Sequence, residues 1–144
     1  MKRIIALSLF WLLVSSDTVA YADIFSKIKV IHATSGKEFI DPPLQPISAV
    51  LKKAFGARFS SFKLLEEQTL TLKLNEKVMM TLPNGNTISL THTGMDGPYF
   101  KIIVESPGLR TQVNIHEGGT FYQAGKSYNG GMLILSITIS SQKM

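Results

Sequence analysis

Residues 78–91 read VMMTLPNGNTISLT, and this stretch predicts a β-hairpin. A loop of three residues, Pro83-Asn84-Gly85, pairs Leu82 with Asn86 and leaves the apolar side chains on one face: Val78, Met80, Leu82, Ile88 and Leu90. A two-residue Asn84-Gly85 turn would divide those side chains between two faces, so the burial pattern selects the longer loop. The loop chemistry agrees, because proline and asparagine suit the central positions of a type I turn and glycine suits the left-handed residue that follows.

Alternation with a period of two continues after the hairpin and predicts further strands. The predicted strands cover residues 100–104, 109–115, 120–123 and 132–139, and the segments predicted as loops by their glycine content are 93–98 and 124–131. The last strand is apolar on both faces in its first half, where Met132 and Ile134 alternate with Leu133 and Leu135. This pattern predicts a central strand that is covered on both sides.

The chain before the hairpin begins with a predicted strand over 27–34 and then changes to helical spacing. Asp41-Pro42 is typical of a helix start and Gly56 of a helix end. The apolar stripe between them consists of Leu44, Ile47, Leu51, Ala54 and Phe55. Pro46 conflicts with a helix that starts at Asp41, so we expect the regular helix to begin nearer Gln45.

A long strand is predicted from Ser60 onward, because its apolar residues are even-numbered: Phe62, Leu64, Leu70, Leu72 and Leu74. Glu66 and Gln68 fall on the same face in its middle. Either the strand bends there or a bulge resets the alternation.

These elements together predict an α+β fold. One helix packs on a mostly antiparallel sheet, or on a small β-sandwich, of about seven strands. Antiparallel pairing is expected because the connections are short turns. No repeat, linker or low-complexity segment divides residues 23–144, which we expect to form a single domain.

Residues 1–22 have the three parts of a secretory signal peptide. Lys2 and Arg3 form the positive start, an apolar run covers residues 4–14, and Ala20-Tyr21-Ala22 fits a cleavage site that leaves Asp23 as the first mature residue. The apolar run is shorter than the roughly 20 residues of a membrane-spanning helix. We therefore expect a periplasmic or secreted bacterial protein, with no transmembrane segment in the mature chain.

The chain contains no cysteine. Disulfides, and a lipid anchor on a cysteine at the cleavage site, are therefore excluded. The formal net charge is +5, and the basic residues are scattered along the chain. This distribution is typical of a solvated surface that is compatible with anionic envelope polymers, and we expect no nucleic-acid partner.

The residues that would carry catalytic or metal chemistry do not form a recognisable constellation. Residues 119–127, GTFYQAGKS, separate two glycines by five residues where a phosphate-binding loop needs four. The histidines, His32, His92 and His116, lie in or beside different predicted strands and lack ligand spacing. No nucleophile elbow occurs, and Glu66 and Glu67 point to opposite strand faces. We name no catalytic residue, and we expect no cofactor and no metal.

The segment from Gly118 to Gly131 is the candidate binding region. It contains five glycines, so its backbone can approach a partner closely. Its candidate binding residues are Tyr122, Lys126 and Tyr128, which supply aromatic area and a charge. The alternative is that the glycines only form turns and the aromatic residues fill the core.

The mature chain resembles, over most of its length, a group of small exported bacterial proteins with no assigned activity. The resemblance rests on an early strand and on four segments: Asp41-Pro42, Phe62-Lys63-Leu64-Leu65, Leu82-Pro83-Asn84-Gly85 and Gly130-Gly131-Met132-Leu133-Ile134-Leu135. It implies export and a single α+β domain, and it brings no catalytic residue.

The sequence favours a non-enzymatic periplasmic or secreted domain that binds another envelope component, a protein or a polymer. The alternative is a small envelope hydrolase whose site is assembled across strands. A cleft with a histidine in hydrogen-bond contact with a carboxylate would favour the hydrolase. An exposed sheet edge or an aromatic patch would favour binding. The sequence defines no oligomeric state.

Overall fold

The computed structural model describes residues 22–144, so the predicted signal peptide lies outside the described residues except for Ala22. A 3-10 helix, η1 (Pro42–Ile47), continues into α1 (Ser48–Phe55). The strands are β1 (Ile24–Thr34), β2 (Phe39–Ile40), β3 (Ser61–Leu72), β4 (Lys77–Thr81), β5 (Thr87–Asp96), β6 (Tyr99–Ser106), β7 (Leu109–Ile115), β8 (Thr120–Tyr128) and β9 (Gly131–Ser140). Neither helix in residues 22–144 is long and apolar enough to cross a membrane.

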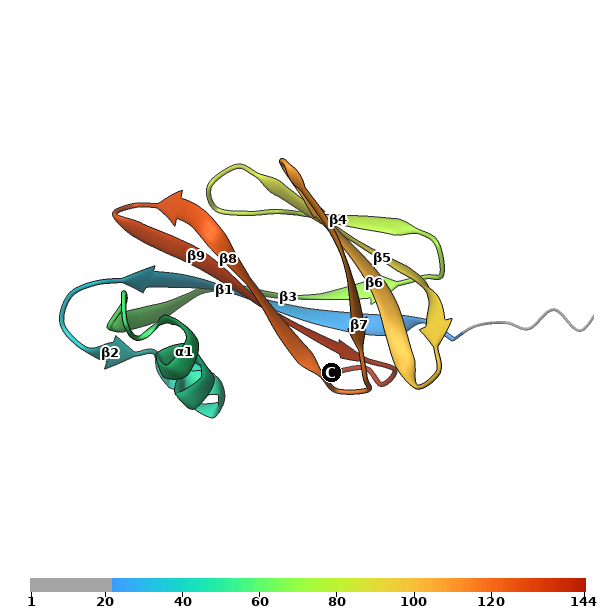
Figure 1. Ribbon diagram of the computed structural model, residues 1–144, viewed down its shortest axis with the longest axis horizontal. Helices are drawn as coiled ribbons and strands as arrows, with labels where there is room; N and C mark the ends of the chain where they lie inside the picture. Colours follow the sequence, from blue (N-terminus) through green and yellow to red (C-terminus); the bar gives the residue numbers. More distant parts are fainter. Residues whose placement is uncertain (1–21) are drawn as a thin grey trace, which may run out of the picture.

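The described strands form two sheets (Figure 1). The five-stranded sheet has the order β2-β3-β1-β9-β8, and the four-stranded sheet has the order β4-β5-β6-β7. Pairing is antiparallel except between the short β2 and β3. The predicted β-rich α+β fold with one short α-helix is confirmed in its sandwich form, although the described residues form nine strands rather than about seven.

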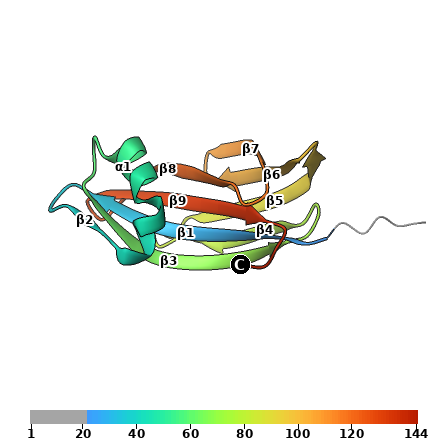
Figure 2. The ribbon, with the colours of Figure 1, turned by 90° about the horizontal axis from the view of Figure 1, so that it is seen from below.

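The main core lies between the two sheets, and in the view of Figure 2 the five-stranded sheet overlaps β4 and β5 of the other sheet. Its buried side chains alternate along each strand, because successive residues of a strand point to opposite faces. They include Ile28, Val30, Leu135 and Ile137 from the five-stranded sheet and Ile88, Leu90, Ile102 and Val104 from the four-stranded sheet.

A second core forms where η1 and α1 cover one end of the opposite face of the five-stranded sheet (Figure 1). Leu44 and Leu51 pack there with apolar side chains of the sheet: Ile31, Ala33, Phe62, Met132 and Ile134. The first half of β9 is therefore buried on both faces, as its sequence predicts. One member of the predicted helical stripe is wrong, because Ala54 is exposed.

The start of the helix differs from the prediction. Regular α-helix begins at Ser48 rather than near Gln45, since the three prolines before it fall in the 3-10 segment. Asp41 is the N-cap residue of that segment, with proline at the first helical position as predicted, but its side chain makes no capping hydrogen bond. Its Oδ2 instead accepts a hydrogen bond from the backbone N–H of Leu64 at 3.0 Å, which ties the start of the helix to β3.

β3 changes face at a bulge, which confirms one of the two predicted explanations for its mixed pattern. Val30 pairs with Glu66, whereas the next residue of β1, Ile31, pairs with Leu64, so Leu65 has no partner in β1. Phe62 and Leu64 consequently pack beneath the helix, while Leu70 and Leu72 pack between the sheets.

The hairpin of β4 and β5 has the predicted register. Met80 pairs with Ile88, and Val78 pairs with Leu90. The Leu82 N–H donates to the Asn86 carbonyl at 2.7 Å, which closes the three-residue loop. Gly85 has φ of +83°, the left-handed conformation expected at that position.

Two segments predicted as loops, 93–98 and 124–131, belong mostly to strands, and only residues 97–98 and 129–130 form turns. β5 continues to Asp96 past a register shift that leaves Thr93 unpaired beside Gly94, and β8 continues to Tyr128 past a shift that leaves Gly125 unpaired. The two glycines have φ of 130° and 131°. The glycines thus make bulges inside paired strands. The turn from β8 to β9 uses Asn129 and Gly130, both with positive φ, as a tight hairpin turn requires.

Candidate binding groove

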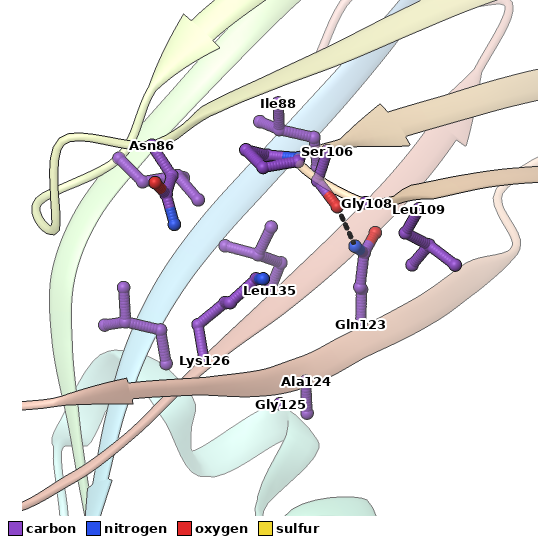
Figure 3. Close-up of a pocket in the computed structure, with 13 residues that line it drawn as sticks. Asn86, Ile88, Ser106, Gly108, Leu109, Gln123, Ala124, Gly125, Lys126 and Leu135 are labelled. Atoms are coloured by element: carbon purple, nitrogen blue, oxygen red, sulfur yellow. Dashed lines mark hydrogen bonds between the residues drawn. The ribbon is translucent and has the colours of Figure 1, made fainter.

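A cavity of about 260 Å³ opens at the surface between the two sheets, at the end where the β4–β5 loop and the β6–β7 turn lie above β8 and β9 (Figure 3). Its apolar floor consists of the buried side chains Leu82, Ile88, Leu133 and Leu135. Its rim carries Asn86, Ser106, Pro107, Gly108, Leu109, Gln123, Ala124, Gly125 and Lys126. We call this cavity the groove.

The bulge at Gly125 decides which side chains of β8 face the groove. Before the bulge, Ala124 pairs with Ile134, and after it Lys126 pairs with Leu133, so Gly125 has no partner in β9. Ile134 belongs to the core under the helix and Leu133 to the core between the sheets. The extra residue therefore turns Lys126 toward the groove, where its ammonium points toward the centre of the cavity in Figure 3.

Polar side chains at the rim hold the two sheets together on one side. The Gln123 Nε2 donates a hydrogen bond to the Ser106 Oγ at 3.2 Å, which links β8 to the end of β6 (Figure 3). Beside this link Leu109 is 48% exposed, so the apolar surface of the groove continues onto the rim. The Asn86 amide faces the groove from the opposite side.

A row of basic side chains leads away from the groove. Lys63 of β3 pairs with His32 of β1, His32 pairs with Leu133 of β9, and Leu133 pairs with Lys126. Paired residues of neighbouring antiparallel strands place their side chains on the same face, about 5 Å apart. Lys63, His32 and Lys126 therefore share the face onto which the groove opens, and we call them the basic row.

His32 has a defined orientation in this row. Its Nε2 lies 2.9 Å from the backbone carbonyl oxygen of Tyr128, and since a carbonyl can only accept, Nε2 carries the proton. The rings of His32 and Tyr128 meet edge to face, with centroids 5.2 Å apart. The hydrogen bond and the ring contact fix the orientation of the His32 ring. The Nδ1 atom takes no part in the hydrogen bond with Tyr128.

The three sequence-predicted binding residues do not lie on one face. Lys126 lines the groove. Tyr128 packs against the main core, and its ring contacts His32. Tyr122 packs on the opposite face, against the core under the helix. Burial raises the pKa of the Tyr122 phenol, and a hydrogen bond with Ser136 opposes the rise. The structure thus brings together Lys126 and Tyr128 but separates Tyr122 from them.

The histidines form no pair with a carboxylate within residues 22–144. His32 bonds to the Tyr128 carbonyl, and His92 bonds to the Gly94 carbonyl at 3.1 Å. Glu66 accepts a hydrogen bond from Gln68, and Glu67 forms an ion pair with Lys27 at 3.1 Å. Among these residues, no group of three histidine or acidic side chains is placed to hold a metal ion.

The groove residues outside β8 were not identified from the sequence. Leu82, Ile88, Leu133 and Leu135 are members of correctly predicted apolar faces, but sequence spacing does not show where a core opens to solvent. His32 and Lys63 are 31 positions apart and meet only through the β1–β3 register. Lys126 was identified from the sequence as the charged residue of the glycine-rich segment 124–131, although that segment is predicted as a loop.

Comparison with known protein families, curated proteins and solved structures finds no match to this chain. The groove and the basic row are therefore interpreted from their own chemistry.

Proposed function

We propose that this protein is a non-enzymatic binding domain of the bacterial envelope, and that its partner inserts an apolar group into the groove. The observation that supports the proposal is the open apolar cavity between the sheets, with the Lys126 ammonium above its floor. Apolar pockets with a few convergent polar groups are the usual form of binding sites. The groove is lined by aliphatic, amide and hydroxyl groups and one ammonium, which bind and orient a ligand.

The partner chemistry follows from the lining. Burial of an apolar group in the groove would remove the exposed surface of Leu109 and of the floor from water, which is favourable. An acidic group attached to it would meet Lys126 and then the rest of the basic row. We propose a periplasmic or secreted protein or polymer that carries an apolar group next to a carboxylate or phosphate.

Recovery of the partner from an envelope extract tests this proposal. The purified protein is immobilised as wild type, as Lys126→Glu and as Lys53→Glu, and the retained components are compared. Lys53 is an exposed lysine on α1, which covers the opposite face of the five-stranded sheet, and it is not part of the groove lining, so it controls for the change in net charge. We expect a component that wild type and Lys53→Glu retain and Lys126→Glu loses. Equal retention by all three proteins would exclude the groove as the site.

A further inference from the structure

The four edges of the two sheets differ in how they are protected against pairing with another strand. The outer edge of β3 is bulged at Leu65 and charged by Glu66 and Glu67, and β2 covers only its start. β8 is interrupted by the bulge at Gly125 and carries Lys126. β4 has only five residues and begins with Lys77. Bulges, short lengths and charges, lysine above all, are the usual means of blocking edge strands.

β7 has a single charged residue, Arg110, and lacks the bulge, the short length and the lysine that protect the other edges. Its seven residues, LRTQVNI, pair with β6 without a register shift and contain no proline, glycine or lysine. It is the last strand of its sheet, so one row of its backbone groups is unpaired. Such an edge is a template for another strand.

The inner face of β7 is also incompletely covered. Leu109 and Thr111 point inward, since they pair with Ser106 and Val104 of β6, and Val104 is buried in the main core. Both are nevertheless exposed, Leu109 by 48%. The first half of β7 therefore extends beyond the cover of the other sheet, and a further strand beside it would find space on its inner side.

We infer that two copies of this chain associate by antiparallel pairing of β7 with β7, about a two-fold axis at Gln112. This register is self-complementary. Leu109 lies opposite Ile115 of the second copy, and Thr111 lies opposite its Val113, so the inward residues match in polarity. The one charged residue of β7, Arg110, lies opposite Asn114, and Gln112 lies opposite Gln112, where two amides can bond.

The pairing joins two four-stranded sheets into one of eight strands and closes the exposed β7 edges. It also brings Ile115 of the second copy beside Leu109, at the rim of the groove. The second copy would therefore extend the apolar rim.

Single cysteines test the register, because the chain contains none of its own. In Gln112→Cys the two thiols face each other across the axis, within the Cα separation of about 4.4–6.8 Å that a disulfide spans. In Arg110→Cys the two positions are offset by four residues, roughly 14 Å along the strands, and are out of reach. We expect disulfide-linked dimers in mild oxidant for Gln112→Cys and monomers for Arg110→Cys. Equal linkage of both, or of neither, would overturn the inference.

Charged substitutions at Gln112 give a second test, and loss of folding cannot produce the result that we expect from it. Like charges directly opposite each other destabilise a strand pair. Gln112→Lys and Gln112→Glu should therefore each raise the dissociation constant of the dimer, measured by light scattering, roughly fivefold. A mixture of the two variants should form the heterodimer at least as tightly as wild type forms the homodimer. A mixture that stays monomeric at concentrations where wild type is dimeric would contradict pairing at Gln112, as would a wild type that is monomeric throughout.

Discussion

Lys126 is the residue on which the interpretation of the groove depends most. Its ammonium is the positive charge in the groove lining, and it stands there because of the neighbouring bulge. An apolar anion should therefore bind in the groove and sense this charge. Anilinonaphthalene sulfonate, a dye with fused aromatic rings and one negative charge, provides both groups.

We predict that the folded protein binds this dye and that Lys126→Glu weakens the binding about fivefold, which corresponds to about 1 kcal/mol for an exposed charge contact. Fluorescence titration of wild type, Lys126→Glu and Lys53→Glu measures the effect. Thermal melts of the three proteins show whether the fold is intact. Equal affinities in the three proteins would mean that the dye, and the apolar surface it reports, lie elsewhere.

His92 is a second residue with a testable consequence. It is buried, its Nε2 bonds to the Gly94 carbonyl, and its Nδ1 has no partner among the described residues. Burial lowers the pKa of His92 below the ordinary value of 6.5, although the Gly94 bond opposes this effect. The folded state therefore binds fewer protons than the unfolded state at mildly acidic pH, and stability falls as the pH drops below 6.5.

We predict that His92→Leu flattens this part of the stability profile. The free energy of unfolding, measured by denaturant titration from neutral pH to about pH 5, should fall less in His92→Leu than in wild type. His116→Leu, which changes an exposed histidine, is the matched control and should keep the wild-type slope. If His92→Leu also kept that slope, another group would be responsible for the acid sensitivity.

At the scale of elements, α1 has one fully buried residue. Leu51 is 0% exposed and packs in the core under the helix. We predict that Leu51→Ala lowers the free energy of unfolding by about 2–5 kcal/mol. The neighbouring Val50 is 44% exposed, so Val50→Ala should change it by less than about 0.5 kcal/mol. Similar melting temperatures for the two variants would show that α1 is not packed as described.

The bulge in β8 makes a prediction that joins stability to binding. Gly125 has φ of +131° and open space around the position of a Cβ atom, so a side chain there meets no clash but a strained backbone. Gly125→Ala should cost about 1–3 kcal/mol and, by shifting Lys126, weaken dye binding. Gly36→Ala is the control, because Gly36 also has open space but no positive φ. A Gly125→Ala variant as stable as Gly36→Ala would mean that the bulge is not strained for other residues.

The β4–β5 hairpin and β8 show which features of the fold the sequence could predict and which it could not. The β4–β5 hairpin was predicted to the residue, because its register depends on local alternation and on three loop residues. The continuation of β8 was predicted as a loop, because Gly125 interrupts the alternation and the strand is held by pairing with β9. A bulge is held by pairing with the neighbouring strand. The local sequence does not show which strand that neighbour is.

At the scale of the whole molecule, the missing information is how strands distant in sequence pair. β1 pairs with β9, so the first and last strands of the described chain are neighbours. The groove depends on this arrangement, since it lies where the β4–β5 loop meets β8 and β9. Lys126 could therefore be nominated from its own surroundings, whereas Lys63 and His32 required the three-dimensional register. The separation of Tyr122 from Lys126 likewise follows from the β8 register.

The central claim is that binding occurs in the groove between the sheets, and amide chemical-shift mapping tests it most directly. Isotope-labelled protein is titrated with anilinonaphthalene sulfonate, and the shift of each backbone amide is followed. We predict that the largest changes occur at Asn86, Leu109, Gln123 and Lys126, which come from the β4–β5 loop, β7 and β8, three segments that meet at the groove. Changes confined to residues around α1 and β2, or spread over the outer face of the five-stranded sheet, would contradict the claim.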